Sequence, residues 1–276
     1  MSGFSPAWLA LREPADRAAR NRDVIARCAL TFAARSSLKV CDLGAGTGAA
    51  LRAFADLLPG EQQWTLVDRD PENLAGALTA LEAWADKALR HDAGLTLHHG
   101  LRRIEVRTEV LDLARDPACW PMDSDLVTAS ALFDLTSAAW IKRLVAALAA
   151  GRRPLLATLT ADEKIAASPP HPLDKKVAAA FRQHQSRDKG FGPSAGADAG
   201  RFLEQTLEAA GYALTAGESP WVLEPSELLQ ATVEGMAAAA AEIGVAGDEL
   251  AAWLEHQREN TKQLIVGHRD VFARIL

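Results

Sequence analysis

The sequence predicts an α/β protein in which helices cover both faces of a mainly parallel sheet. Apolar runs of strand length alternate with segments of helical period along most of the chain. The first of these runs ends in a glycine-rich turn that leads into a helix. Of the 276 residues, 49% are hydrophobic, which is enough to bury a full core. Helical crossovers between successive strands favour a parallel sheet.

Two helices are expected before the first strand. Ser5 and Pro6 can cap and start a short helix at Trp8. A second helix is expected from Pro14 to about Arg35, because apolar side chains recur there at i, i+3, i+4 and i+7. The first strand then follows at residues 38–42.

The alternation continues after the glycine-rich turn. A helix is expected from about Thr47 to Pro59-Gly60, and residues 64–68 are predicted to form the second strand. Asp70 is placed to cap the next helix, because Pro71 after it suits the first helical position.

Three more strands are predicted before residue 160. Residues 103–110 alternate between charged and apolar side chains, which indicates a half-exposed strand at the edge of the sheet. Residues 125–129 lack this alternation and are expected to be central, as are residues 154–159. A helix over 137–150 joins these two strands, whereas residues 112–124 are too short for a full helix and suggest an irregular crossover.

The alternation of strands and helices is interrupted at residues 161–197, where proline- and glycine-rich segments flank a polar helix near 173–187. Long connections in compact domains often serve as lids or binding loops, so we expect this segment to cover a ligand site. The elements expected beyond it are a helix around Phe202–Leu207 closed by Gly211, a strand at 221–223, helices capped by Ser226 and Asp248, and a last strand at 263–266.

Composition excludes several classes of protein. The formal net charge of −6 disfavours a general polyanion binder, because neutralising phosphates needs surplus Lys and Arg. The three cysteines, Cys28, Cys41 and Cys119, are widely spaced, which excludes a disulfide framework and a thiolate zinc site. His98 and His99 have no supporting ligand cluster, so no metal site is expected. Without a signal peptide pattern or a run of bilayer length, a cytoplasmic location is expected.

The stretch that carries chemistry is Asp42-Leu-Gly44-Ala-Gly46-Thr-Gly48, a strand-to-helix turn of the form D-x-G-x-G-x-G. Glycines let the backbone approach a ligand closely, and the helix behind offers free N–H groups. Gly44-x-Gly46-x-x-Ala49 also fits the dinucleotide fingerprint, so an NAD-dependent oxidoreductase is the competing interpretation.

Acidic residues around the turn argue against the oxidoreductase interpretation. Asp42 lies two positions before the first glycine, and Gly48 adds a third glycine. Asp68 ends the next strand, where a ribose diol would lie, and Asp112 ends the one after it, where a carboxylate could bind an adenine amino group.

This constellation resembles the class I (Rossmann-like) S-adenosylmethionine-dependent methyltransferases, over residues 36–160 and more loosely over 198–275. Segments 8–20, 221–224 and 266–273 also look like bacterial members of this family, of unassigned substrate. The resemblance implies a three-layer, doubly wound sheet of seven strands in the order 3-2-1-4-5-7-6, with strand 7 antiparallel.

On this interpretation residues 1–276 form a single methyltransferase domain. Its parts are an N-terminal helical cap (1–37), a cofactor-binding core (38–160), a lid insertion (161–197) and the C-terminal part of the sheet (198–276). The resemblance implies S-adenosylmethionine as cofactor and S-adenosylhomocysteine as product. The residues that it implies for cofactor binding are Arg20 at the carboxylate, Asp42, Gly44, Ala45, Gly46 and Gly48 in the turn, Asp68 at the ribose with Arg69 beside it in the sequence, Asp112 and Leu113 at the adenine, and Ser130 near the methyl group.

The acceptor is expected to be a small molecule with an O or N nucleophile. The fourth strand lacks the Asn/Asp-Pro-Pro-Tyr/Phe motif of enzymes that methylate amino groups of nucleobases or protein amides, and nucleic acid is an unexpected partner for an acidic chain.

Asp134 and His184 are the candidate general bases, and His171 and Asp188 are weaker ones. A macromolecular methyltransferase and a non-catalytic cofactor-binding module remain the alternatives. Phe191 is expected in the pocket and Phe133 in the core.

Overall fold

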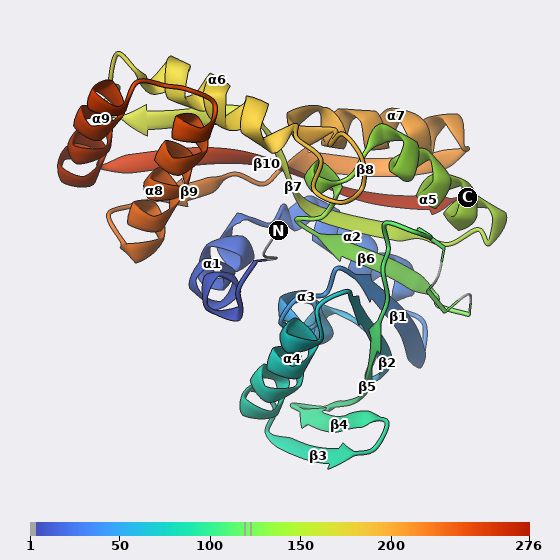
Figure 1. Cartoon of the computed structure of the whole chain (residues 1–276). Helices are drawn as coiled ribbons and strands as arrows, with labels where there is room; N and C mark the ends of the chain where they lie inside the picture. Colours follow the sequence, from blue (N-terminus) through green and yellow to red (C-terminus); the bar gives the residue numbers. More distant parts are fainter. Residues whose placement is uncertain (1–3, 119, 122) are drawn as a thin grey trace.

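A computed structural model describes residues 4–118, 120–121 and 123–276. Within these residues the strands join into one mixed sheet of ten, whose main path runs β3-β4-β5-β2-β1-β6-β7-β10-β8, with β9 paired to β10 (Figure 1). The strands are β1 (Ser37–Leu43), β2 (Glu61–Asp68), β3 (Lys87–His91), β4 (Gly94–His99), β5 (Arg102–Val110), β6 (Leu126–Ser130), β7 (Leu155–Ser168), β8 (Tyr212–Glu218), β9 (Trp221–Leu223) and β10 (Gln263–Ile275).

Helices cover both faces of this sheet, which confirms the α/β class. The helices are α1 (Pro6–Ala19), α2 (Arg22–Phe32), α3 (Ala49–Phe54), α4 (Pro71–Trp84), α5 (Ala138–Ala150), α6 (Asp174–Gln185), α7 (Ala199–Ala209), α8 (Glu227–Glu242) and α9 (Gly247–Asn260), with single turns η1 (Ala55–Leu57), η2 (Phe133–Leu135) and η3 (Gly196–Asp198). Val40 of β1 packs into a cluster with α2, α3 and α4, whereas its neighbour Cys41 packs with α5 and α7. This alternation along one strand produces three layers.

The sheet is parallel through β5, β2, β1, β6 and β7, and β10 runs antiparallel to β7 and β8. The expected number of seven strands is wrong, because the antiparallel hairpin β3–β4 extends the sheet beyond β5 and the short β9 joins β10. β8, at residues 212–218, was also not expected from the sequence.

The prediction that residues 103–110 form an edge strand is wrong as well. β5 pairs with β2 on one side and with β4 on the other. Its alternation arises from the two faces of the sheet: Ile104 and Val106 are buried, whereas Arg107 lies on the other face and donates to Thr65 Oγ1 of β2 at 2.7 Å. The stretch at 112–124 contains no helix among its described residues, so that face of β5 stays half-exposed.

Helix starts agree with the local capping signals in four places. The side chains of Ser5, Asp70, Ser137 and Ser226 each accept a hydrogen bond from a backbone N–H in the first turn of the helix that follows. Asp248 is not a cap, because α9 already begins at Gly247 and the carboxylate lies in its first turn.

The predicted helix from Pro14 to Arg35 is also wrong. Pro14 lies inside α1, and the chain breaks at Arg20 before α2 begins. The break is stabilised by Asn21, whose side chain accepts hydrogen bonds from the N–H groups of Asp23 and Val24. A new N-cap therefore separates two helices that share an apolar pattern.

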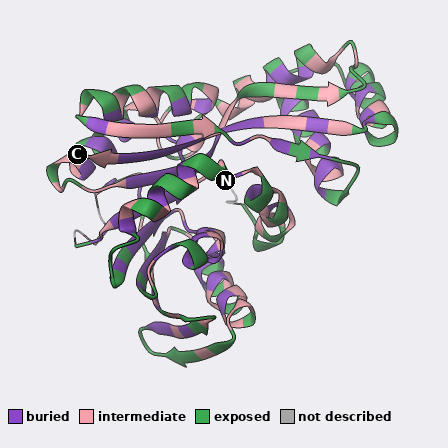
Figure 2. Ribbon diagram, turned by 180° about the vertical axis from the view of Figure 1, so that it is seen from behind, coloured by how far each residue is buried: buried purple, intermediate pink, exposed green. Residues whose placement is uncertain are grey.

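The connection expected at 161–197 begins later than predicted, because β7 continues to Ser168. The outer halves of β7 and β10 extend together beyond the rest of the sheet (Figure 1). Seen from behind, the residues along β7 change from buried to intermediate and exposed towards its far end (Figure 2). These outer halves with α6, β9, α8 and α9 form what we call the helical lobe, packed around a third apolar cluster that includes Val177, Val233 and Trp253.

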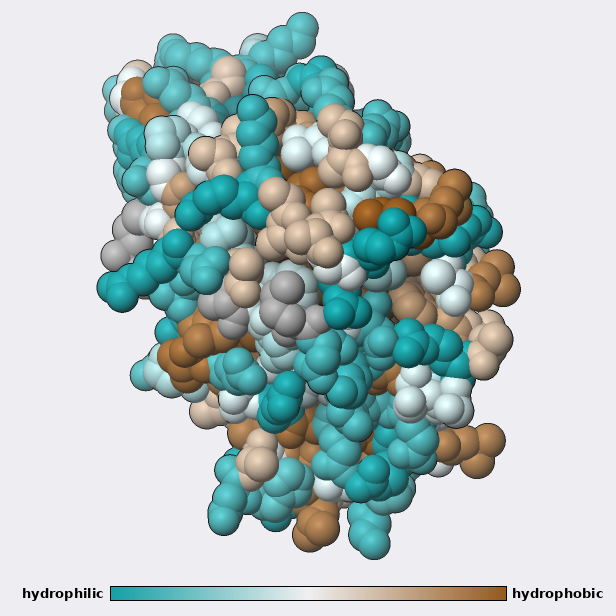
Figure 3. All heavy atoms as spheres, turned by 90° about the vertical axis from the view of Figure 1, so that its right-hand side faces the viewer, coloured by the Kyte–Doolittle hydropathy of each residue, from teal (hydrophilic) through white to brown (hydrophobic). Residues whose placement is uncertain are grey.

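The surface in Figure 3 is mostly hydrophilic, with apolar residues in separate patches. None of the helices in the described part of the chain is long and apolar enough to cross a membrane. Cys28 and Cys41 are both buried, and Cys119 lies outside the described residues. The described residues contain no group of three or more His, Cys, Asp or Glu side chains that could hold a metal ion.

Candidate functional site

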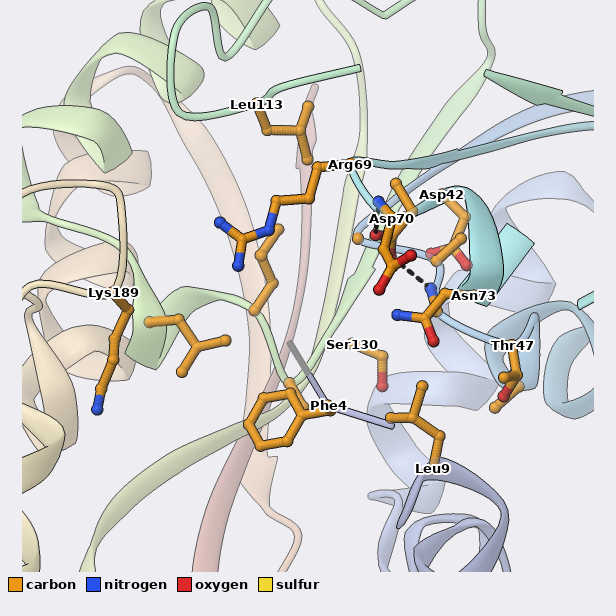
Figure 4. Close-up of a pocket in the computed structure, with 18 of the residues that line it drawn as sticks. Phe4, Leu9, Asp42, Thr47, Arg69, Asp70, Asn73, Leu113, Ser130 and Lys189 are labelled. Atoms are coloured by element: carbon orange, nitrogen blue, oxygen red, sulfur yellow. Dashed lines mark hydrogen bonds between the residues drawn. The ribbon is translucent and has the colours of Figure 1, made fainter. Parts of the chain in front are cut away.

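A pocket of about 550 Å³ lies at the carboxyl ends of the central parallel strands (Figure 4). Strand ends β1, β2, β5 and β6 form one side of it, and α1 and the loop after α6 form the other. In Figure 4, Arg69 lies above the pocket and Lys189 at its left, and Phe4 and Leu9 of the N-terminal segment lie along its lower edge. Pockets at the carboxyl ends of parallel strands are the usual ligand sites of open α/β sheets.

The glycine-rich turn forms the strand side of the pocket. Gly44, Gly46 and Gly48 have φ values of +68°, +52° and +75°, which glycine adopts without strain. A Cβ atom at Gly46 would lie 3.0 Å from Leu9 Cδ1, so α1 packs directly on the turn. Gly48 faces Ala77 and Leu81 of α4 rather than the pocket, and its role is to shape the turn.

Asp68 holds this turn in place. One carboxylate oxygen, Oδ2, accepts the N–H of Gly46 at 2.9 Å, and the other, Oδ1, accepts the N–H of Asp70 at the same distance. A carboxylate oxygen has two acceptor sites, so Asp68 can still receive hydrogen bonds from ligand hydroxyls in the pocket that it lines.

Asp42 lines the pocket from the end of β1 and is almost fully buried, at 1% exposure. Thr128 Oγ1 donates to its Oδ1 at 2.8 Å, whereas its Oδ2 has no partner among the described residues. Burial raises the pKa of Asp42 to about 7, although Thr128 and Arg20 oppose the shift. A buried carboxylate with a free oxygen is suited to a cationic group of a ligand.

Arg20 lies behind the pocket wall rather than in it. The residue is 8% exposed, and its guanidinium stacks over the Phe54 ring at 5.1 Å. None of its three side-chain nitrogens has a hydrogen-bond partner in the described part of the chain. Burial lowers the pKa of Arg20, and the charges of Asp16, Asp270 and Asp42 oppose that shift. An unpaired buried guanidinium is costly, and a carboxylate is its best partner.

The opposite end of the pocket is formed by the residues after β5. Leu113 is buried, and its carbonyl accepts the indole N–H of Trp140 at 2.6 Å. Asp112 accepts the N–H of Ala114 at 3.1 Å and pairs with Arg115 at 3.2 Å. The Asp112 carboxylate therefore stabilises the local turn. Asp112 also lines the pocket.

Two further predicted residues line the pocket. Arg69 is exposed and lies against the loop after α6, because a Cβ atom at Gly190 would be 3.3 Å from its Nη1. Ser130 ends β6, and its hydroxyl accepts a hydrogen bond from Thr158 Oγ1 at 3.1 Å.

The candidate bases occupy different surroundings. His184 lines the pocket and places Nε2 3.1 Å from Glu242 Oε2. Asp134 lies in η2 behind the wall, and burial raises its pKa to about 6. His171 and Asp188 do not line the pocket and instead accept backbone N–H groups in their own loops.

The two phenylalanines lie where they were expected: Phe191 lines the pocket with its ring edge-on to Trp140 at 5.4 Å, and Phe133 is fully buried.

Of the predicted site residues, Arg20, Gly48 and Asp134 are not part of the pocket lining. Those that line it are Asp42, Gly44, Ala45, Gly46, Asp68, Arg69, Asp112, Leu113, Ser130 and His184. Other residues of the lining were not predicted from the sequence, among them Phe4, Leu9, Asn73, Leu135, Lys189 and Glu242. Only Asn73, in the first turn of the helix after the ribose-side acid, has a positional signal.

No protein-family model matches the sequence, and no curated protein matches it. Solved structures resemble the fold. A cyclopropane-fatty-acyl-phospholipid synthase-like protein from Lactobacillus casei matches with a TM-score of 0.53 and 18% identity, over 94% of this chain and 91% of that one. The cyclopropane synthase MmaA2 from Mycobacterium tuberculosis matches with a TM-score of 0.52 and 12% identity, over 98% and 94%.

Magnesium protoporphyrin IX methyltransferase from Synechocystis, solved with bound S-adenosylhomocysteine, matches with a TM-score of 0.50 and 12% identity, over 99% of this chain and 89% of that one. These likenesses show that the chain has the class I methyltransferase fold. The fold expected from the glycine-rich turn is therefore confirmed.

Proposed function

We propose that the protein binds S-adenosylmethionine in this pocket and transfers its methyl group to an O or N nucleophile of a small molecule. The observation that carries the proposal is a pair of buried charged groups without hydrogen-bond partners among the described residues: Asp42 Oδ2, whose residue lines the pocket, and Arg20, which lies behind the wall near Asp42. A buried cation and a buried anion side by side match the carboxylate and ammonium of an amino-acid group.

Other residues of the pocket are suited to the remaining parts of the cofactor. Asp68, fixed by two backbone N–H groups, can accept the ribose hydroxyls. Leu113 offers an apolar surface for adenine, and Asp112 lies beside it. Ser130 lies at the end of β6, on the other side of β1 from the strand ends that carry Asp68 and Asp112. When bound, S-adenosylmethionine supplies an activated methyl group on a sulfonium.

The turn itself argues against a dinucleotide. A pyrophosphate needs free N–H groups from the turn, but here Ala45 donates to Val67 O, Gly46 donates to Asp68, and Gly48 donates to Ala45 O. The carboxylate of Asp68 at the turn would also repel a pyrophosphate. The formal dinucleotide fingerprint is therefore not matched by a phosphate cradle.

The N-terminal segment and the helical lobe support a small acceptor. Phe4 and Leu9 line the pocket from one side, while His184 and Glu242 line it from the helical lobe and Lys189 from the loop after α6. The described residues thus bound the pocket on several sides. Methyl transfer benefits from holding nucleophile and methyl group in line and from excluding water, which a bounded pocket provides.

A thermal-shift comparison tests this proposal. S-adenosylmethionine, S-adenosylhomocysteine and NADH are each added to the full chain. A ligand at 100 times its Kd stabilises the protein by about 2.7 kcal/mol, so the two adenosyl ligands should raise Tm by a few degrees. NADH should leave Tm unchanged. A rise with NADH and none with the adenosyl ligands would refute the proposal.

A further inference from the structure

Asn73 is a buried polar residue of the pocket that the contacts proposed above leave unused. It lies in the first turn of α4, it lines the pocket, and only 5% of its surface is exposed. In Figure 4 its amide points into the pocket from the same side as Asp70. A few polar groups placed in this way usually fix the orientation of a ligand in its pocket.

The amide of Asn73 has no hydrogen-bond partner in the part of the chain that the structure describes. Its Oδ1 is shielded from solvent and accepts no hydrogen bond from a described residue, and its Nδ2 donates to none of them. Buried polar groups in native proteins are almost always satisfied. The free amide therefore indicates a polar group that binds in the pocket.

The start of α4 explains why this amide is free. Asp70 is the N-cap of the helix, and Asn73 is the third residue after it, where a polar side chain often reaches back to the N–H of the cap residue. Here the N–H of Asp70 already donates to Asp68 Oδ1 at 2.9 Å. Asp68 has therefore taken the local partner of Asn73, and the two side chains are neighbours at the N-cap of α4.

The surroundings of Asp68 are rich in acceptors, and their donors are already used. Asp68 itself takes the backbone N–H groups of Gly46 and Asp70. The guanidinium of Arg69 lies against the loop after α6. A ligand hydroxyl that donates to Asp68 can still accept hydrogen bonds at its own oxygen, and Asn73 Nδ2 is a donor without a partner beside it.

Charged ligand groups fit this corner of the pocket less well. An ammonium only donates hydrogen bonds, so it would leave Asn73 Nδ2 without an acceptor. A carboxylate or a phosphate would be repelled by Asp68 and Asp70, which both line the pocket. A neutral group that both donates and accepts is therefore favoured.

A pair of neighbouring hydroxyls matches this set of groups. A hydroxyl donates one hydrogen bond and can accept two, an ionised carboxylate only accepts, and an amide does both. With two hydroxyls, one can donate to the carboxylate and accept from the amide nitrogen, while the other donates to the amide oxygen. All polar atoms of the amide are then satisfied.

Resting on the S-adenosylmethionine site proposed above, we propose that Asn73 is a specificity-determining residue whose amide binds the ribose hydroxyls together with Asp68. One hydroxyl donates to Asp68 and accepts from Asn73 Nδ2, and the other donates to Asn73 Oδ1. The pocket thus selects a ligand with free hydroxyls on both neighbouring ribose carbons and discriminates against its deoxy analogues.

Calorimetric titration of the full chain with S-adenosylhomocysteine and with its 2′,3′-dideoxy analogue tests this assignment. Asn73→Leu keeps a side chain of similar size that forms no hydrogen bonds, so it should weaken S-adenosylhomocysteine binding by about 10–100-fold. It should change the affinity for the dideoxy analogue by less than about twofold, because that ligand has no hydroxyls for the amide. Asn73→Ala should give the same pattern, which excludes a steric block by leucine.

The stability of the ligand-free protein separates a binding role of Asn73 from a structural one. Because the amide has no partner among the described residues, leucine at this position should leave Tm unchanged or raise it. Glu72→Ala is the matched control on the same helical turn, because Glu72 is exposed and does not line the pocket. This variant should bind both ligands with the native affinities.

The results distinguish the role of Asn73 from the proposed function on which it rests. A native chain that does not bind S-adenosylhomocysteine would refute the proposed function. If the native chain binds it but the Asn73 variants keep the native affinity, or lose affinity equally for both ligands, the role of Asn73 is overturned. A fall in Tm in ligand-free Asn73→Leu, or an equal loss of affinity in Glu72→Ala, would also overturn it.

Discussion

The affinity for S-adenosylhomocysteine should depend on the ionisation of Asp42. Burial raises the pKa of this carboxyl to about 7, and its Oδ2 is unpartnered among the described residues. The ammonium of the ligand binds the ionised form, so binding at low pH requires Asp42 to lose a proton first. With a pKa near 7, the ionised fraction is roughly 10% at pH 6 and 90% at pH 8. The affinity should thus rise about tenfold over this range, or by about 1.4 kcal/mol.

Isothermal titration calorimetry at pH 6, 7 and 8 measures this dependence. Asp42→Asn is the matched variant, because the amide keeps the oxygen that accepts from Thr128 at 2.8 Å but carries no charge at any pH. Its affinity should be about tenfold below that of the native chain at pH 8 and nearly constant with pH. Titrations in buffers of different ionisation enthalpy should show proton release on binding to the native chain at pH 6.

Other titratable groups line the same pocket, notably His184, which lies 3.1 Å from Glu242. An unchanged pH dependence in Asp42→Asn would assign the titration to one of these groups. That result would refute the pairing of Asp42 with a cationic part of the ligand.

Three further substitutions test separate parts of the account. Arg20→Gln should weaken S-adenosylhomocysteine binding, measured by calorimetry, by about 10–100-fold, because a charge-assisted hydrogen bond is worth about 1.5–3 kcal/mol. The affinity for 5′-methylthioadenosine, which lacks the amino-acid group, should not change, and equal losses for both ligands would contradict the role of Arg20. Asp68→Ala should abolish the thermal shift with S-adenosylhomocysteine while the protein stays folded by circular dichroism, because the acceptor for Gly46 N–H is lost with the ribose partner; an undiminished shift would remove Asp68 from the site. Asp270→Ala should lower the free energy of unfolding, measured in urea, by about 3–5 kcal/mol. The reason is that the Asp270 carboxylate accepts hydrogen bonds from Asn21 N, Leu159 N and Ser219 Oγ in the core. A loss under 1 kcal/mol would show that this network is not stabilising.

Local signals in the sequence predicted helix starts better than strand pairing. Ser5, Asp70, Ser137 and Ser226 cap helices through atoms two or three residues away, so the sequence nearby contains the information. The hairpin β3–β4 was missed because Lys87–His91 has little apolar alternation and is mostly exposed. The outer half of β7 was interpreted as part of a connection because Asp162, Glu163 and Lys164 interrupt its apolar run and Pro169 follows it, and pairing with β10 makes it a strand.

The same distinction applies to the site. The glycine-rich turn and Asp68 were predictable because turn and strand end are defined by short-range spacing, and both line the pocket. The surroundings of Asp134 depend on Ala161 and Arg12, which are distant in the sequence. The contact between His184 and Glu242 spans 58 residues and joins α6 to α8. Such pairs arise from the packing of the helical lobe and have no local signature.

The most direct test of the central claim is a crystal structure of the full chain grown with S-adenosylhomocysteine. Electron density for the ligand is expected in the pocket, with its carboxylate at Arg20, its ammonium at Asp42 and its ribose hydroxyls at Asp68. Density for the ligand in which the amino-acid group lies away from Arg20 and Asp42, or a pocket without ligand at saturating concentration, would contradict it.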